Sequence, residues 1–506
     1  VRTQFARNIN FDWSASRPLQ GLKTDKFATR WEGKFDFKEG YHHFSGEADD
    51  GIRVWVGDVK VIDHWEMDWQ WQGKVQAVPY ISKGQHTVKV EYRERYGSAK
   101  INLAWDEVAG CATTPENTFC MELFNNKTLS GIARQVITTD GINFDWAEGQ
   151  PDPLVSKDGF SARWTGKQRF TAGNYRFTTD TDEGVRVLVD GVPVIDKWTQ
   201  QNSKQYKILN LTEGFHTITM ESFDSWSVAR AKLNWDKLPQ CNQIPDDRLC
   251  AEFYATPDLT GDVVDIVIVD AINFDWAANS PSAFVPKDKF SVRWSGKVNF
   301  DADMYRFVTD TDDGIKVFVG GEPLIDAWSL PSPWYGKQRR LKKMTKGLHN
   351  IKVEYREDWG SAKASVIWEK APDCAVSTPE GKFCASFYNT MDLSGEIADT
   401  RYDNAINFDW ASSAPHPSVK SDGFSVRWNG KFDFAEGEYT FTARSDDGFR
   451  LVIDGQEIIK AWKDQGPTTY SKRLFLTGGL HTIKVEYYEK WGGGSCTTGM
   501  ESGDVE

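Results

Sequence analysis

The chain has 506 residues, a formal net charge of −13 and 13% aromatic residues, 22 of them Trp. This acidic balance argues against nucleic acid and anionic membranes as partners, because phosphate binding needs clustered Lys and Arg. No apolar run in the sequence approaches the roughly 18–20 residues of a membrane-spanning helix.

One short sequence, I-N-F-D-W, occurs four times along the chain, at Ile9–Trp13, Ile142–Trp146, Ile272–Trp276 and Ile406–Trp410. The copies recur about every 130 residues, a period that indicates tandem modules of one fold. A segment of this length can bury a core of its own. Function must therefore be argued first for one module and then for the array.

Each module reads as strands and turns. Residues 185–189 and 192–195 are apolar-rich and flank Asp190-Gly191, a pattern typical of a tight β-hairpin. No window shows the 3.6-residue period of an amphipathic helix. We expect an all-β chain of four tandem antiparallel β-sandwich modules, jelly-roll-like, joined by disulfide-braced linkers.

We place the modules at residues 1–108, 119–237, 248–370 and 382–492. Module 1 is expected to lack the opening strand, and module 4 to lack the closing strand. Residues 493–506 resemble the start of a further module. Two explanations stay open: the sequence is a slice of a longer array, or one chain's tail completes module 1 of the next chain by strand addition.

Six cysteines lie between the modules at nearly equal spacing. We expect one local disulfide per joint, with free thiols as the alternative: Cys111–Cys120, Cys241–Cys250 and Cys374–Cys384. Zinc would favour a C-x2-C spacing or added His, and neither occurs here. Disulfides of this kind indicate an extracellular or cell-surface protein. Cys496 is left over, and we expect it at a joint, where it could bond to another chain.

Ordered blocks recur in each module. They include Phe124-Asn125-Asn126 with Leu129-Ser130-Gly131, F-x-x-R-W-x-G around Trp164, and Asp446-Asp447-Gly448 followed by Ile453-Asp454-Gly455. The order resembles the protective-antigen-type (PA-14) domain family over nearly the whole chain. The resemblance implies a β-sandwich that serves toxins, glycosidases, adhesins and flocculation lectins, mostly as an accessory module, so it indicates the fold more firmly than the function.

The same resemblance implies a metal site. In the lectin branch of the family, two successive aspartates joined by a cis peptide hold calcium, and the calcium holds sugar hydroxyls. The matching residues are Asp49, Asp50, Asp312, Asp313, Asp446 and Asp447. Module 2 has Asp182 and Glu183 instead, so we expect weaker calcium binding or none there. The alternative is ordinary turn chemistry, in which Asp accepts backbone N–H bonds.

A second acidic position lies beside tryptophan in the V-I-D-x-W block. The candidate sugar-binding residues are Asp63, Trp65, Asp196, Trp198, Asp326 and Trp328. A hydrogen-bonded core corner is the alternative interpretation. We expect the tryptophans of I-N-F-D-W and R-W-x-G to be core anchors.

No catalytic or nucleotide-binding motif occurs, and we expect no enzyme. The sequence predicts an extracellular structural or adhesive repeat protein that forms a stalk, sheath or filament by head-to-tail assembly with copies of itself. The alternatives are a calcium-dependent multivalent lectin that binds cell-surface glycans, and an accessory region of a secreted glycosidase.

Overall fold

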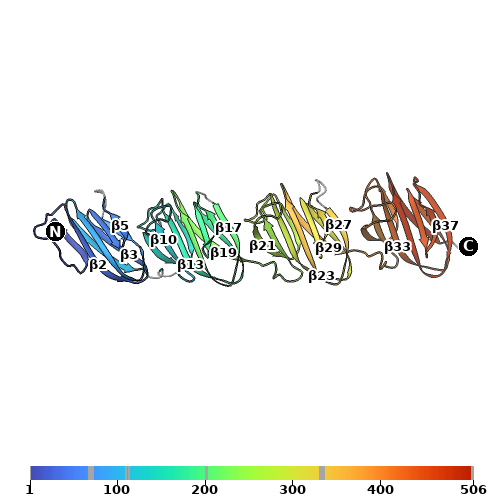
Figure 1. Ribbon diagram of the computed structural model, residues 1–506. Coiled ribbons are helices and arrows are strands. Elements are labelled where there is room, and N and C mark those ends of the chain that lie inside the picture. Colours follow the sequence, from blue (N-terminus) through green and yellow to red (C-terminus); the bar gives the residue numbers. More distant parts are fainter. Residues whose placement is uncertain are drawn as a thin grey trace. The chain divides into compact units, whose positions relative to one another are not determined.

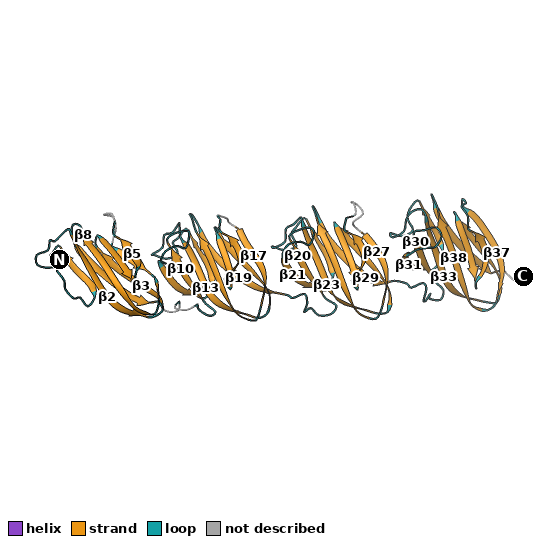
Figure 2. Cartoon of the chain, viewed as in Figure 1, coloured by secondary structure: helices purple, strands orange, loops and turns teal. Residues whose placement is uncertain are grey.

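The computed structural model describes residues 2–66, 73–108, 111, 114–199, 203–329 and 337–502. These residues form strands and no helix, and the chain divides into two compact units, Val1–Leu238 and Pro239–Glu506. Each unit contains two modules (Figures 1 and 2). No helix long and apolar enough to cross a membrane occurs in the described part of the chain.

Module 2 shows the complete architecture. Its strands are β10 (Phe119–Phe124), β11 (Gln135–Thr139), β12 (Ile142–Ala147), β13 (Ser161–Phe170), β14 (Gly173–Thr181), β15 (Val185–Val189), β16 (Val192–Lys197), β17 (Ser203–Leu211), β18 (Gly214–Phe223) and β19 (Ala229–Leu238). A six-stranded sheet in the order β11-β10-β13-β18-β15-β16 faces a four-stranded sheet in the order β12-β19-β14-β17. Neighbouring strands are antiparallel, which confirms the predicted β-sandwich.

Modules 3 and 4 repeat this order. Module 3 has β20 (Leu249–Tyr254), β21 (Val263–Val269), β22 (Ile272–Ala277), β23 (Phe290–Phe300), β24 (Asp303–Asp312), β25 (Gly314–Val319), β26 (Glu322–Ala327), β27 (Lys337–Met344), β28 (Gly347–Glu357) and β29 (Ala362–Lys370). Module 4 has β30 (Phe383–Tyr388), β31 (Ile397–Asp403), β32 (Asn407–Ala411), β33 (Phe424–Phe434), β34 (Gly437–Ser445), β35 (Gly448–Ile453), β36 (Gln456–Ala461), β37 (Thr468–Leu476), β38 (Gly479–Glu489) and β39 (Gly494–Ser502).

Module 1 has a smaller first sheet. Its strands are β1 (Ile9–Ser14), β2 (Phe27–Phe37), β3 (Gly40–Ala48), β4 (Gly51–Val56), β5 (Val59–His64), β6 (Lys74–Ala77), β7 (Tyr80–Ile81), β8 (Gly84–Glu94) and β9 (Ala99–Glu107). The sheet β2-β8-β4-β5 has four strands where modules 2 to 4 have six. Within the described part of module 1, no strand takes the places of β10 and β11.

Aromatic side chains fill the space between the two sheets of each module. Trp164, Trp294 and Trp428 of the R-W-x-G block are fully buried. The I-N-F-D-W tryptophans lie at the rim of the core, where Trp146 stacks on Phe144 with ring centroids 5.1 Å apart. Alternation along the strands explains this placement, because every second side chain points between the sheets.

The end of module 4 differs from the prediction. Residues 494–502 form β39, which pairs with β32 and β34 as β19 pairs with β12 and β14. The prediction that module 4 lacks its closing strand and that residues 493–506 begin another module is therefore wrong for 494–502; residues 503–506 lie outside the described part. The strand was missed because Thr498 and Met500 occupy the positions of Leu233 and Trp235.

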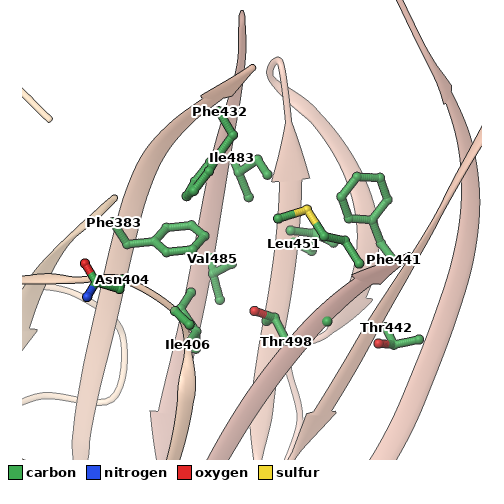
Figure 3. Close-up of a pocket in the computed structure, with 13 residues that line it drawn as sticks. Phe383, Asn404, Ile406, Phe432, Phe441, Thr442, Leu451, Ile483, Val485 and Thr498 are labelled. Atoms are coloured by element: carbon green, nitrogen blue, oxygen red, sulfur yellow. The ribbon is translucent and has the colours of Figure 1, made fainter. Parts of the chain in front are cut away.

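This exchange leaves a pocket at the edge of the core of module 4, where Met500 is 46% exposed (Figure 3). Its volume is about 100 Å³, and Thr498 and Met500 line it together with Phe383, Phe441 and Ile483. In module 2, the ring centroids of Trp235 and its strand partner Phe177 lie 5.8 Å apart. In module 4, Met500 and its strand partner Phe441 occupy these two positions. Smaller side chains on β39 thus account for the cavity.

The three joint disulfides are confirmed: Cys111–Cys120, Cys241–Cys250 and Cys374–Cys384. Cys496 is not at a joint. It is fully buried on β39, at the position of Ala231 in module 2, and burial raises the pKa of its thiol. The expectation that Cys496 lies where it could bond to another chain is wrong, because strand alternation turns its side chain into the core.

Candidate functional site

The acidic pairs lie on the turns that connect the two sheets, at β3–β4, β14–β15, β24–β25 and β34–β35. In module 3, the peptide bond between Asp312 and Asp313 is cis. The loop after the long strand β28 lies against this turn. The Asp313 carboxylate accepts the backbone N–H of Asp358 at 2.7 Å, so turn and loop form one site.

The loop of module 3 is held at two points. Asp313 holds its start, and Asp288 accepts the backbone N–H of Gly360 at 3.1 Å. Trp359 lies between these two anchors and is 69% exposed. The two carboxylates therefore present an aromatic ring to solvent beside the acidic turn.

A buried glutamate completes the acidic cluster. Glu357 is fully buried, and one carboxylate oxygen accepts the Tyr355 hydroxyl at 2.8 Å. Its other oxygen, Oε1, has no hydrogen-bond partner among the described residues. Burial raises the pKa of Glu357 to about 8, and the negative charges of Asp313 and Asp312 add to the rise. A buried carboxylate oxygen without a partner is costly, and a cation would relieve the cost.

Modules 1 and 4 repeat the cluster. Glu94 and Glu489 are buried, accept a tyrosine hydroxyl at 2.7 Å and keep one oxygen without a partner among the described residues. Burial raises the pKa of each of these glutamates to about 7. Burial, followed by the charge of the next aspartate, also raises the pKa of Asp49, Asp312 and Asp446. The carboxylates thus disfavour one another's charge, and a nearby cation would favour the charged forms.

The acidic residues of module 2 differ in side-chain length from those of the other modules. The second residue of the pair is Glu183 instead of Asp, and the strand-end acid is Asp224 instead of Glu. Asp224 is 3% exposed, and neither of its carboxylate oxygens has a hydrogen-bond partner among the described residues. Burial, followed by the charge of Glu183, raises the pKa of Asp224 to about 7. Module 2 therefore keeps a carboxylate at each position, although weaker calcium binding there stays a prediction.

Within the described residues, no three His, Cys, Asp or Glu side chains converge as a complete metal-binding group. The acidic pair and the buried acid are hard oxygen donors, the type that calcium prefers. If calcium binds here, they would supply part of its coordination shell, and the other oxygens would come from the loop, water or a ligand.

Sequence reasoning missed an aromatic residue that recurs two positions after the buried acid. These residues are Tyr96 at 69%, Trp226 at 65%, Trp359 at 69% and Trp491 at 75% exposure. The spacing from the Y-x-E block was the available signal. Exposed rings at one repeated position contrast with the buried rings elsewhere in the modules, and they are suited to stacking on a ligand.

The predicted sugar-binding residues of V-I-D-x-W lie on the hairpins β4–β5, β15–β16 and β25–β26. In module 1, Arg53 lies 4.4 Å from the Trp65 ring centroid and pairs with Asp63 at 3.3 Å. In module 2, Arg186 lies 4.4 Å from the Trp198 ring centroid and pairs with Asp196 at 3.1 Å. In module 3, Lys316 pairs with Asp326 at 3.6 Å and lies 5.5 Å from the Trp328 ring centroid. A basic side chain thus occupies one face of each ring, and sugar binding there stays a prediction.

Comparisons with known proteins cover most of the chain. The family model described as PA14 domain matches residues 3–118, 115–237, 249–374 and 380–504. The anti-sigma-I factor RsgI3 of Acetivibrio thermocellus is 34% identical over 269 residues, which is 49% of this chain and 41% of that protein. The chain thus matches less than half of that relative's length.

Two solved structures are also similar. An anti-sigma factor domain-containing protein is 32% identical, covering 50% of this chain and 93% of that chain with a TM-score of 0.23. A PA14 sugar-binding domain from an RTX adhesin is 19% identical, covering 25% of this chain and 94% of that chain with a TM-score of 0.22.

Proposed function

Because the chain belongs to the PA14 domain family, matched four times over nearly its whole length, we propose that it is a multivalent, calcium-dependent carbohydrate-binding protein. The observation that carries the proposal is the recurrence, in every module, of an exposed aromatic ring beside a cluster of carboxylates. This function is the calcium-dependent lectin that the sequence offers as an alternative to a structural role.

The chemistry of the site matches the two faces of a sugar. In module 3, Asp312 and Asp313 would contribute carboxylate oxygens to a calcium ion, and the hydroxyls of a sugar would contribute others. The apolar face of the sugar ring stacks on Trp359. Binding needs no catalytic step, since the acids gather around one turn and do not face each other across a cleft.

The array adds to the affinity of each site. A single shallow site binds weakly, but several linked sites that reach the same surface raise the overall affinity by a large factor. The joint disulfides support an extracellular location, in which a glycan-bearing surface is accessible. We therefore propose an adhesive role outside the cell.

Head-to-tail assembly and an accessory role beside a glycosidase stay predictions. The segment expected to reach the next chain is taken up in part by β39. Self-assembly would therefore require another contact, so we rank glycan binding above it.

A glycan array with the full chain tests the proposal in calcium and in a chelator. We expect calcium-dependent binding that is lost when Tyr96, Trp226, Trp359 and Trp491 are all changed to Ala. These side chains are 65–75% exposed, so the melting temperature should stay close to that of the parent. Trp65→Ala, Trp198→Ala and Trp328→Ala together form the matched control, because these rings also recur at one repeat position but are half-buried.

Calcium should also raise the melting temperature of the parent, because a ligand that binds only the native state stabilises it. Replacing Asp312 and Asp313 with Asn should reduce the measured calcium stoichiometry by one site. Glycan binding that is equal in chelator and unaffected by the four aromatic changes would refute the proposal.

A further inference from the structure

The exposed ring that recurs two positions after the buried acid has a different charged neighbourhood in each module. One variable position directly follows the aspartate that anchors the loop, and it holds Lys26, Gly159, Lys289 and Gly423 in modules 1 to 4. The other directly precedes the ring, and it holds Arg95, Ser225, Asp358 and Lys490. The acidic turn and the anchoring aspartate recur in all four modules. The two variable positions therefore distinguish one ring from another.

The backbone at the first variable position is left-handed in all four modules. Its φ is 60° at Lys26 and 59° at Lys289, and 71° and 67° at the glycines Gly159 and Gly423. Glycine adopts this conformation without strain, whereas a residue with a Cβ does so rarely. Modules 1 and 3 thus place a lysine where the backbone favours glycine, and a favourable contact of the lysine side chain would offset the strain.

In both of these modules the lysine ammonium lies over the exposed ring. Lys26 Nζ is 4.7 Å from the ring centroid of Tyr96, and Lys289 Nζ is 4.3 Å from the ring centroid of Trp359. At these distances a cation is attracted by the negative face of the ring. The contact holds a positive charge within reach of the substituents of a sugar that stacks on the same ring.

Module 1 has the most basic surroundings. The Glu66 carboxylate is shared by two guanidinium groups, since Arg93 and Arg95 each lie 3.1 Å from it. Arg95 is 48% exposed in its side chain, and Lys26 is also exposed. Apart from the acidic turn and the anchoring aspartate, cations therefore outnumber carboxylates beside Tyr96 among the described residues.

In module 3 a carboxylate at the second variable position reduces this excess. Asp358 lies 3.8 Å from Lys289 and 3.0 Å from Arg356. The positive charge over the ring of Trp359 is thus partly matched, so module 3 lies between module 1 and the remaining two modules.

Modules 2 and 4 carry no cation at the first variable position. In module 2 both positions are uncharged, as Gly159 and Ser225. In module 4 the second position is Lys490, which forms an ion pair with Asp464. Module 2 is therefore the natural reference for module 1, because it keeps the exposed ring and lacks both basic side chains.

We propose that the ring site of module 1 selects sugars with a negatively charged group, a carboxylate or a sulfate, whereas the site of module 2 selects neutral sugars. Lys26 and Arg95 determine this specificity. They attract the anionic group by charge-assisted hydrogen bonds while the sugar ring stacks on Tyr96. The inference rests on the proposed glycan binding and names the substrate class of two of its sites.

Exchange of the two variable residues between modules 1 and 2 tests the proposal. Lys26→Gly with Arg95→Ser gives module 1 the residues of module 2 and keeps the Tyr96 ring. Gly159→Lys with Ser225→Arg is the reciprocal change. A Cβ on Gly159 would have no atom within 4 Å, and Lys26 shows that a lysine can adopt this backbone conformation.

Each full-length variant is measured in calcium on a glycan array of matched pairs, in which uronic acids and sulfated sugars stand beside their neutral parents. We expect the change in module 1 to lower binding to acidic sugars at least about fivefold, the effect of losing exposed charge contacts, with neutral binding unchanged. The reciprocal change should raise acidic binding above that of the parent. Raising NaCl from about 50 to about 300 mM should weaken acidic binding of the parent more than that of the module 1 variant, because salt screens charge.

Three results would overturn the proposal. Equal loss of acidic and neutral binding would show that the two residues only support the shape of the site. Acidic binding that neither exchange alters would show that calcium alone attracts the anionic group. A parent that binds only neutral sugars would also overturn it and leave the proposed glycan binding intact, whereas a parent that binds no glycan would refute the proposed function and this inference together.

Discussion

Refilling the core of module 4 should stabilise it. Thr498→Leu together with Met500→Trp restores the side-chain types that β19 of module 2 carries at Leu233 and Trp235. The cavity that Thr498 and Met500 leave is about 100 Å³ (Figure 3). At about 24 cal/mol per Å³, filling an enclosed cavity of this size would contribute about 2.4 kcal/mol. Because Met500 is 46% exposed and the pocket opens to solvent, we expect about half of this value, roughly 1 kcal/mol.

Differential scanning calorimetry of the full chain, together with hydrogen exchange along Gly437–Ser445, would measure the effect. A gain of about 1 kcal/mol corresponds to a rise of roughly 4 °C in the transition of a module of this size. Hydrogen exchange assigns the change to module 4, because only strands next to the cavity should become more protected.

The reciprocal change in module 2, Leu233→Thr together with Trp235→Met, is the matched control. It should lower the stability of module 2 by a comparable amount, since it creates the same cavity in a filled core. If the double variant in module 4 left its transition unchanged or lowered it, the substituted side chains would not be the cause of the cavity, and the reasoning would be refuted.

Three further predictions concern stability. Trp164→Ala should destabilise module 2 by about 3–5 kcal/mol in chemical denaturation, because this ring is fully buried; an unchanged unfolding curve would contradict its role as a core anchor. The hydrogen bond that His481 Nδ1 donates to the Asp454 carboxylate raises the pKa of His481 above its usual 6.5. This pair therefore stabilises module 4 below about pH 6.5, and the stabilisation is lost as the pH rises through the raised pKa. Asp454→Asn should flatten that dependence in melting curves from pH 5.5 to 8.5, and a dependence that persists would point to other groups. Replacing Cys241 and Cys250 with Ser should lower the free energy of unfolding by roughly 2–3 kcal/mol, because the disulfide closes a loop that restricts the unfolded chain. Equal stability of the parent with and without reductant would count against this prediction.

The sequence by itself determined the repeat, the fold class and the joint disulfides. These depend on local and periodic information: a recurring I-N-F-D-W, alternation of apolar residues along strands, and paired cysteines such as Cys111 and Cys120 at a constant place in the repeat. Each signal lies within a short stretch of chain and recurs, so one copy supports the interpretation of the next.

Only the tertiary structure decided which side chains share a site. Asp313 and Trp359 are far apart in sequence, and a backbone hydrogen bond from the loop after β28 brings them together. The closing strand β39 was also decided by tertiary pairing, since strand addition relies on backbone groups and proceeds although Thr498 and Met500 lack the expected motif. Its register placed Cys496 in the core, because the direction of a strand side chain is set by pairing with neighbours that the local sequence does not contain.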